Sequence, residues 1–286
     1  MLSKTVKKQR YALLAHPAKH SLSPQIHNYG FEVNRLNAVY FVIDTVASGA
    51  AVAEQIRRMP LAGCNLSLPL KETLLPELDE ISINARLIGA INTVRNEDGR
   101  LIGENTDGTG MVADLAAHGV QLEQAQVLLL GGGATARAIL TALALTPVVQ
   151  VTVLQRANRP HFAQLQHLCA QLAAQTTTKL SCHDWQKIDQ LEWSRFTLVI
   201  NATSIGFGSH AEQAPLTAAQ LQQLAPTTKV WDVIYEPRQS QLLQQADQLG
   251  LETHNGLGML VQQAAGAFQF WTGKTLPVNE IQSFLK

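Results

Sequence analysis

Three polar side chains near the ends of predicted strands have the chemistry for proton transfer. Lys71 follows Pro69, which stops an apolar strand at 63–68, while Asn92 and Asp107 are each expected at a strand end in the same part of the chain. A lysine beside an aspartate suits proton transfer at a hydroxyl group, because burial and a nearby carboxylate tune the acidity of an ammonium group. We therefore expect one site that contains all three. The alternative is that Lys71 is a solvated surface lysine, as most lysines are.

Two serines lie in the Pro- and Ser-rich loop that follows the first predicted strand. Ser21 and Ser23 are placed where open α/β sheets bind ligands, beyond the carboxyl end of a strand. Ser23 followed by Pro24 also has the pattern of a helix N-cap with proline in the first turn, so the serines are either ligand contacts or only caps. The histidines of this segment have no carboxylate or cysteine in their loop, and we expect no metal site at His16, His20 and His27.

A glycine-rich turn joins an apolar strand to a helix in the middle of the chain. Residues 127–130 are typical of a buried parallel strand, and good helix formers begin at Ala134. With Gly131, Gly132 and Gly133 between them, the segment reads G-x-G-x-x-A, the dinucleotide-binding fingerprint. Gly133 would let the backbone approach a pyrophosphate, whose charge is bound by N–H groups at the helix start. The alternative is a tight turn that binds no ligand.

The residues after the next predicted strand indicate which dinucleotide is bound. NAD-binding domains place an acidic residue about 20 residues beyond the glycine loop, where it accepts the ribose hydroxyls. Here the strand at 149–154 is followed by Gln155-Arg156-Ala157-Asn158-Arg159, with no carboxylate and two guanidinium groups. Arg156 and Arg159 can pair with the 2′-phosphate, so we expect NADP. They can also be solvated loop residues, and Asn158 leaves some use of NAD open.

Strands and helices alternate both before and after the glycine loop. We expect strands at 11–15, 39–43, 63–68, 90–94 and 101–103 before it, and at 149–154, 196–200, 229–234 and 251–254 after it. Helices are expected at 46–59, 81–88, 110–117, 162–174, 240–249 and 258–271, and residues 281–285 close the chain. This alternation predicts an α/β protein with mainly parallel sheets and helices on both faces.

Composition excludes several classes of partner. The chain has 286 residues, enough for two domains, and its 22 Lys and Arg balance 22 Asp and Glu, so no net field attracts nucleic acid or an anionic membrane. Three scattered cysteines are too few for a disulfide framework and fit a reducing cytosol. Residues 1–10 are polar and basic, and no apolar run approaches the roughly 20 residues that span a bilayer. We therefore expect a cytoplasmic protein.

The chain resembles the shikimate dehydrogenase family nearly from end to end, in several spaced motifs that occur in the family's order. Besides the glycine loop, the motifs are His20-Ser21-Leu22-Ser23-Pro24, Asn65-Leu66-Ser67-Leu68-Pro69-Leu70-Lys71, Gly89-Ala90-Ile91-Asn92-Thr93, Asn105-Thr106-Asp107-Gly108, Asn201-Ala202-Thr203-Ser204, Asp232-Val233-Ile234-Tyr235-Glu236-Pro237, and Gly256-Leu257-Gly258-Met259-Leu260-Val261-Gln262-Gln263.

The resemblance implies an enzyme that interconverts 3-dehydroshikimate and shikimate with NADP, in aromatic amino acid biosynthesis. It makes Lys71 the catalytic acid/base and Asp107 its partner. It implies substrate contacts at Ser21, Ser23, Ser67, Asn92, Tyr235 and Gln263. It implies cofactor contacts at Gly131, Gly132, Gly133, Ala134, Thr135, Gln155, Arg156, Arg159, Thr203, Val233 and Gly256.

The family fold has two α/β domains, and its last helices return to the first. For this chain it predicts a substrate domain at 1–109 plus 257–286 and a Rossmann-type domain at 110–256. Glycines near the two crossovers are candidate hinges, or they serve caps and close packing: Gly108, Gly110, Gly256 and Gly258. Monomer and homodimer are both open.

Some positions depart from the family pattern. Ala15-His16-Pro17 stands where members commonly have Gly-Asn-Pro, the glycine loop lacks the usual Gly-Ala-Gly-Gly order, and Gln155 replaces an asparagine. Ser67 and the turn at 96–99 resemble the branch that also accepts quinate. The alternatives are therefore a quinate/shikimate dehydrogenase that uses NAD or NADP, and a non-catalytic nucleotide-binding paralogue, against which the retention of Lys71 and Asp107 argues.

Overall fold

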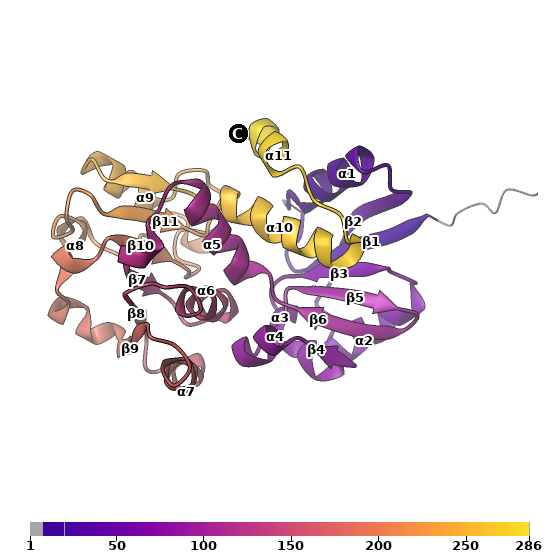
Figure 1. The fold of residues 1–286 in the computed structure, drawn as a ribbon, viewed down its shortest axis with the longest axis horizontal. Helices are drawn as coiled ribbons and strands as arrows, with labels where there is room; N and C mark the ends of the chain where they lie inside the picture. The colour runs from indigo at the N-terminus through magenta and orange to yellow at the C-terminus, as the bar shows by residue number, and fades with distance from the viewer. Residues whose placement is uncertain (1–7, 20, 286) are drawn as a thin grey trace, which may run out of the picture. The chain divides into compact units, whose positions relative to one another are not determined.

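The computed structural model describes residues 8–19 and 21–285 and divides the chain into two units. Unit 1 is built from residues up to Gly110 and from Val261 onward, and unit 2 from Met111–Leu260 (Figure 1). The assignment of substrate and dinucleotide binding to the domains 1–109 plus 257–286 and 110–256 stays a prediction. In the described part of the chain, no helix combines the length and apolar character that crossing a membrane requires.

Unit 1 contains a six-stranded sheet in which one strand is antiparallel to its neighbours. The strands follow the order β2-β1-β3-β5-β6-β4, with bounds Ala38–Asp44, Gln9–Ala15, Gly63–Leu66, Thr93–Glu97, Arg100–Glu104 and Glu80–Ile81. Because β5 runs antiparallel to both β3 and β6, its first residue lies at the edge where those two strands end. The predicted strands at 90–94 and 101–103 are therefore β5 and β6, joined as a hairpin.

Helices cover both faces of this sheet. Leu14 and Leu66 pack in one apolar cluster with Ile56 of α2 (Gly49–Arg58) and Leu74, which follows α3 (Leu70–Thr73). On the other face the ring of Tyr11 lies 5.0 Å from that of Phe31 and 5.1 Å from that of Trp271. The remaining helices of the unit are α1 (Ser23–Val33), α4 (Ile83–Ile88), the 3₁₀ turn η1 (Leu75–Glu77), α11 (Val278–Leu285), and parts of α5 (Asp107–Ala117) and α10 (Leu257–Thr272).

Unit 2 contains a six-stranded, wholly parallel sheet. Its strand order is β9-β8-β7-β10-β11-β12, with bounds Lys179–Asp184, Gln150–Gln155, Gln126–Leu130, Leu198–Asn201, Lys229–Asp232 and Glu252–His254. In chain order this is 3-2-1-4-5-6, the arrangement of doubly wound dinucleotide-binding domains. The order reverses between β7 and β10, which is where such sheets bind their ligands.

The predicted strands of unit 2 are confirmed, but β9 was not predicted. Its sequence Lys179–Asp184 alternates between one apolar and one polar face, and it lies at an edge of the sheet. The helices are α6 (Ala134–Ala144), α7 (His161–Ala173), α8 (Ala218–Leu221) and α9 (Gln241–Gln248). The 3₁₀ turns are η2 (Leu122–Gln124), η3 (Trp185–Gln190), η4 (Trp193–Arg195) and η5 (Gly208–His210).

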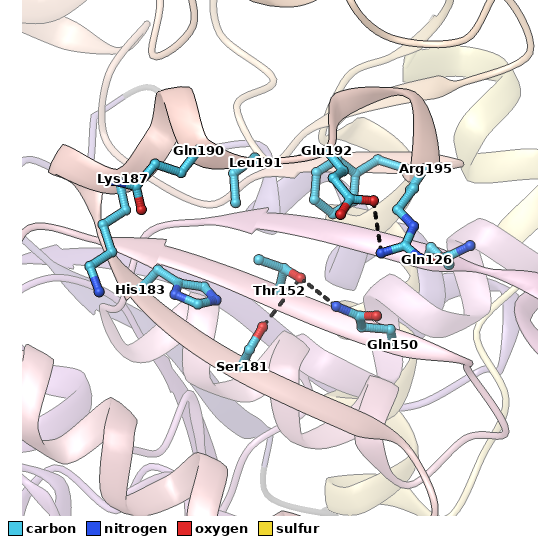
Figure 2. A pocket seen from close by; sticks show the side chains of 11 residues that line it. Gln126, Gln150, Thr152, Ser181, His183, Lys187, Gln190, Leu191, Glu192 and Arg195 are labelled. Carbon is cyan, nitrogen blue, oxygen red and sulfur yellow. Dashed lines mark hydrogen bonds and ion pairs between the residues drawn. The ribbon is translucent and has the colours of Figure 1, made fainter.

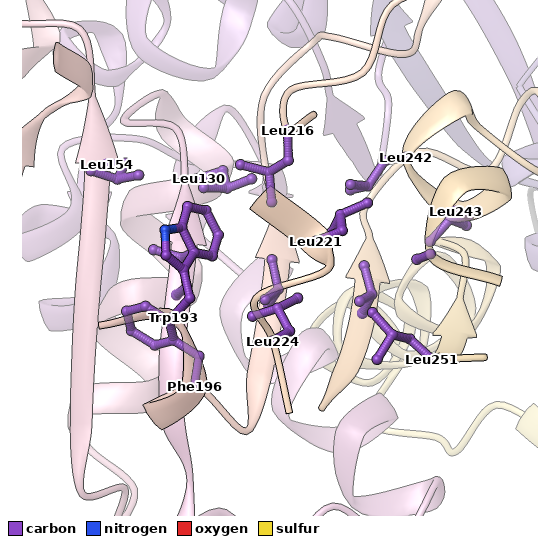
Figure 3. Packing of buried hydrophobic residues seen from close by; sticks show 14 of the residues in the cluster. Leu130, Leu154, Trp193, Phe196, Leu216, Leu221, Leu224, Leu242, Leu243 and Leu251 are labelled. Atoms are coloured by element: carbon purple, nitrogen blue, oxygen red, sulfur yellow. The ribbon is translucent and has the colours of Figure 1, made fainter. Parts of the chain in front are cut away.

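One face of this sheet carries the main apolar core of unit 2. Figure 3 shows Leu130 of β7 and Leu154 of β8 packed with Trp193 of η4, and Leu242 and Leu243 of α9 extending the cluster. The connection from β9 to β10 is made by η3 and η4 rather than by a long helix. Trp193 and the partly buried Trp185 of this crossover both pack on the core, and Trp193 is only 3% exposed.

Candidate active site

An ion pair between Lys71 and Asp107 forms the centre of the site in unit 1. Lys71 lies in α3, which begins after Pro69, and not at a strand end as predicted. Asp107 is the first residue of α5, where the helix dipole favours a negative charge. Lys71 Nζ is 2.5 Å from Asp107 Oδ2, and the two side chains are only 13% and 7% exposed. The predicted lysine–aspartate pair is thus formed, largely shielded from water.

Asn92 holds the second oxygen of the same carboxylate. Its Nδ2 donates to Asp107 Oδ1 at 2.7 Å, so both carboxylate oxygens have a donor. The expectation that Asn92 follows a strand is wrong, because Asn92 precedes β5. It still lies at the edge shared with the ends of β3 and β6, since β5 is antiparallel to both.

Gln263 of α10 also belongs to this cluster, together with Thr106, to which the sequence analysis assigned no role. Gln263 Oε1 accepts from Asn92 Nδ2 at 3.3 Å, and the Gln263 carbonyl accepts from the Thr106 hydroxyl at 2.9 Å. A Cβ atom at Gly110 would lie 2.7 Å from the Gln263 backbone nitrogen, so glycine allows this approach. Thr106 belongs to the motif Asn105-Thr106-Asp107-Gly108. Its role was not predicted, because no spacing rule identifies a residue that acts through its backbone N–H.

The serines lie at the same sheet edge as Lys71. Ser21 and Ser23 follow β1, and Ser67 follows the neighbouring β3, with its N–H bonded to the Leu14 carbonyl at 3.1 Å. The prediction that Ser23 is the N-cap of α1 is wrong, because the helix begins at Ser23 and the N-cap residue is Leu22. Ser23 is 6% exposed, and the half-buried Ser21 hydroxyl accepts from the Ser23 N–H at 3.2 Å. Their contact with substrate stays a prediction.

The histidines near these serines have different surroundings. His16 Nδ1 is 2.7 Å from Asp44 Oδ1, which ties the loop after β1 to the end of β2. His27 is fully buried and stacks on Tyr40 at 4.5 Å between ring centres, and burial lowers its pKa to about 3. His20 lies outside the described residues. Among the residues that are described, no group of three His, Cys, Asp or Glu is placed to hold a metal ion.

The glycine loop of unit 2 has the geometry that a pyrophosphate site needs. Gly131 has φ +110°, in a region that favours glycine, and a Cβ there would lie 2.9 Å from the Ala202 carbonyl oxygen. A Cβ at Gly132 would meet Gln155 at 2.9 Å, whereas one at Gly133 would meet nothing within 4 Å. Gly131 and Gly132 thus permit close packing, and Gly133 leaves open space at the start of α6, which has no side-chain cap.

The loop after β8 carries the predicted contacts to the 2′-phosphate. Arg156 and Arg159 are exposed, and within residues 8–19 and 21–285 neither guanidinium has a hydrogen-bond or ion-pair partner. Asp184, which no sequence pattern indicated, accepts from the Ala157 N–H through its Oδ1 at 3.0 Å. Asp184 ends β9 and pairs in register with Gln155. A carboxylate from a separate strand therefore fixes the backbone of the arginine loop.

The other predicted positions of unit 2 follow β10, β11 and β12 or begin α6. Thr203 donates its hydroxyl to Asn201 Oδ1 at 2.7 Å. The Val233 N–H bonds to the Asn201 carbonyl at 3.0 Å, and a Cβ at Gly256 would lie 2.0 Å from the Val233 carbonyl oxygen. Tyr235 is half-buried, and burial raises its pKa. Ala134 and Thr135 form the first turn of α6.

Three of the four candidate hinge glycines permit close packing. This holds for Gly110 and Gly256, as described above, and for Gly258, where a Cβ would lie 1.9 Å from Asp114 Oδ1. None of the three has a positive φ. Their role as hinges stays a prediction.

A separate hollow in unit 2 contains none of the predicted site residues. It has a volume of about 210 Å³ and lies beneath η3 and η4 (Figure 2). The hydroxyls of Thr152 and Ser181, 3.3 Å apart, face the hollow. They lie on the same face of the sheet as the apolar core described above. The hollow follows from the short crossover, which leaves the β8–β9 end of that face partly uncovered. The polar side chains there suit contact with water.

Comparison with known proteins identifies the family. Residues 13–94 match the model of the shikimate dehydrogenase substrate binding domain, and residues 256–282 match that of the shikimate 5′-dehydrogenase C-terminal domain. The chain is 39% identical over 276 residues to shikimate dehydrogenase (NADP(+)) of Latilactobacillus sakei, covering 96% of this chain and 95% of that protein.

Two solved structures are similar over almost the whole chain. Shikimate 5-dehydrogenase from Listeria monocytogenes, in complex with shikimate and NAD, has a TM-score of 0.86 and 33% identity, covering 98% of this chain and 96% of that one. The ligand-free 5-ketofructose reductase of a Gluconobacter strain has a TM-score of 0.82 and 32% identity, covering 98% of each chain. On this similarity, and on the matches of its sequence, the chain belongs to the shikimate dehydrogenase family.

Proposed function

We propose that this chain is an NADP-dependent shikimate dehydrogenase, an oxidoreductase that interconverts 3-dehydroshikimate and shikimate in aromatic amino acid biosynthesis. The observation that carries the proposal is the buried Lys71–Asp107 pair with Asn92 on its second oxygen, in a chain similar to NADP-dependent family members along its whole length. Because both members of the pair are retained and in contact, we favour an enzyme over a non-catalytic nucleotide-binding paralogue.

The residues of unit 1 have distinct roles in this reaction. In the biosynthetic direction the Lys71 ammonium gives a proton to the oxygen of 3-dehydroshikimate, and in the oxidation of shikimate the neutral Lys71 amine takes the proton of the reacting hydroxyl. Asp107 accepts hydrogen bonds at both oxygens, which fixes its position beside Nζ. Ser21, Ser23, Ser67, Asn92 and Gln263 would orient the substrate, together with Tyr235 of unit 2.

When bound, NADPH would supply the hydride for the reduction and NADP+ would accept it in the oxidation. Gly133 and the N–H groups that begin α6 would hold the pyrophosphate, and Arg156 and Arg159 the 2′-phosphate. The open space at Gly133 and the exposed, unpaired guanidinium groups fit these roles. Gln155, Thr203, Val233 and Gly256 would contact the rest of the cofactor.

Lys71 provides the direct test of the mechanism. Lys71→Ala should lower kcat by roughly 10²- to 10⁴-fold, the range that general acid–base catalysis contributes. The matched control is Lys274→Ala, an exposed lysine of the same unit, which should keep wild-type turnover. Wild-type-like kcat in Lys71→Ala would remove Lys71 from the mechanism.

The substrate is tested by side-by-side assays of the wild-type protein with shikimate, quinate and 5-ketofructose. The first two separate shikimate dehydrogenase from the quinate-accepting branch, and the third follows from the similarity to 5-ketofructose reductase. We expect the highest kcat/KM with shikimate. No turnover of shikimate would refute the proposed function.

We further propose that the enzyme works in the cytoplasm, as a monomer or homodimer, without a nucleic acid or membrane partner. The balanced charge of the chain and its three free cysteines support this setting. Sedimentation of the purified protein distinguishes the two oligomeric states.

A further inference from the structure

Thr106 is buried beside Asn92, which holds the Asp107 carboxylate, and only 5% of the residue is exposed. Its backbone N–H donates to Asn92 Oδ1 at 2.8 Å, and its hydroxyl lies 3.0 Å from Asn92 Nδ2. The same hydroxyl donates to the Gln263 carbonyl oxygen at 2.9 Å. Thr106 therefore contacts both ends of the Asn92 carboxamide and also α10.

These contacts determine which way the carboxamide of Asn92 points. A backbone N–H can only donate, so the end of the carboxamide facing it must be the oxygen. The hydroxyl has one proton, which the 2.9 Å contact with the Gln263 carbonyl uses in preference to the 3.3 Å contact with Asn92 Oδ1. Its lone pairs are then free to accept from Asn92 Nδ2. The amide end is thereby directed to Asp107 Oδ1, 2.7 Å away.

We propose that Thr106 is a positioning residue for the reaction, which acts through Asn92 to fix the carboxylate beside Lys71; the inference rests on the proposed function. With its carboxamide reversed, Asn92 would place an oxygen against Asp107 and repel it. Thr106 prevents this reversal from both ends of the carboxamide. Its side-chain contact with Asn92, which in turn donates to Asp107 Oδ1, links it to the carboxylate.

Two substitutions distinguish the effect of the Thr106 hydroxyl from that of its methyl group. Thr106→Val keeps the branched shape that packs on α10, where a Cβ at Gly266 would lie 3.0 Å from the Thr106 methyl carbon. It removes the hydroxyl that bridges Asn92 and Gln263. Thr106→Ser keeps the hydroxyl and removes that methyl group. If Thr106→Val does not fold, Thr106→Ala also removes the hydroxyl without placing a methyl group against Asn92.

The first experiment does not depend on turnover. In ¹⁵N-labelled protein the side-chain NH₂ signals of Asn92, assigned with Asn92→Asp, report the environment of the carboxamide. We expect them to shift and to exchange faster in Thr106→Val, and to stay near their wild-type positions in Thr106→Ser. Unchanged signals in Thr106→Val would overturn the inference whether or not the protein turns over shikimate.

The second experiment measures kinetics with shikimate and NADP. The loss of one hydrogen bond contributes about 1 kcal/mol, so Thr106→Val should lower kcat roughly three- to tenfold, with a smaller change in KM. Thr106→Ser should stay within about twofold of wild type. Equal losses in both variants, or none in Thr106→Val, would contradict a role of the hydroxyl, whereas an inactive wild type would refute the proposed function instead.

Discussion

Arg156 and Arg159 are the residues on which the choice between NADP and NAD depends. Each Arg→Ala substitution removes a charge-assisted contact to the 2′-phosphate, which is worth about 1.5–3 kcal/mol. We therefore expect each to raise the Kd for NADP roughly tenfold or more and to change the Kd for NAD little. Titration of cofactor fluorescence with each variant measures both constants.

The control for this prediction is Arg195→Ala. Arg195 is exposed in the same unit and pairs with Glu192 at 2.9 Å, away from the loop after β8. Its removal should leave the ratio of the two dissociation constants unchanged. If the arginine variants of the loop also keep the wild-type ratio, the 2′-phosphate is held elsewhere.

The types and positions of the residues indicated most of the site. The contacts that were not predicted were missed for physical reasons. Lys71 and Asp107 were found because both are charged and adjoin apolar strands. Thr106 was not found, since its contribution comes from a backbone N–H and from a partner on α10, more than 150 residues away in sequence. Asp184 was missed for a related reason: it reaches the arginine loop from β9, an edge strand that was not predicted, 27 residues away in sequence from Ala157.

At the scale of elements, the strand pattern predicted most of the strands of unit 1 but not all of their pairings. The sequence indicated strands on either side of the turn at 96–99, and a hairpin requires that one of them run against the other. It did not indicate that β5 would pair with β3 as well. Because of that pairing, Asn92, which precedes β5, lies at the sheet edge near Lys71 and Asp107. A parallel β5 would have placed Asn92 at the opposite edge.

Asp232, at the end of β11, makes the stability of unit 2 depend on pH. Burial raises its pKa to about 6, against the opposing effect of hydrogen bonds from Ser240, Ile234 and Asn201. Between the ordinary value of 3.8 and about 6 the folded state binds the proton more tightly than the unfolded state. Stability therefore decreases as pH rises through this window, by on the order of 3 kcal/mol for a shift of this size.

Asp232→Asn removes this ionisation and keeps an acceptor for the Asn201 and Ile234 donors. We expect its free energy of unfolding to vary less between pH 4 and 7 than that of the wild type. Urea unfolding monitored by circular dichroism at several pH values measures the slope. Asp247→Asn, at an exposed position of α9, is the matched control and should retain the wild-type slope. An unaltered slope in Asp232→Asn would contradict the buried ionisation.

At the scale of the molecule, we expect the two units to respond to acid in opposite directions. In unit 1, burial lowers the pKa of His27 to about 3, so the unfolded state binds a proton below pH 6.5 that the folded state does not. Hydrogen bonds lower the pKa of Asp44, chiefly from His16, and that of Asp79, chiefly from the Leu101 N–H. Stability from these groups is lost as pH falls.

In unit 2 the same fall in pH favours the folded state at Asp232, as shown above, and at Asp114, whose pKa burial raises. Glu252 and His254 of β12 oppose this, since the pKa of each is lowered. Both are more exposed than Asp232, so water screens their contribution more strongly. The balance in unit 2 therefore favours acid stability, while that in unit 1 does not.

We therefore expect acidification from pH 7 to pH 5 to open unit 1 before unit 2. At pH 5, which is 1.5 units below the pKa of an unfolded histidine, His27 alone should lower the free energy of unfolding by about 2 kcal/mol. Hydrogen exchange read by mass spectrometry, corrected for the intrinsic pH dependence of exchange, should show faster exchange at pH 5 in peptides of β1, β2 and α1, with those of β7 and β10 protected. His27→Phe keeps a ring against Tyr40 and should reduce this acid sensitivity. Exchange that rises first in the sheet of unit 2 would show that other ionisations govern the acid response.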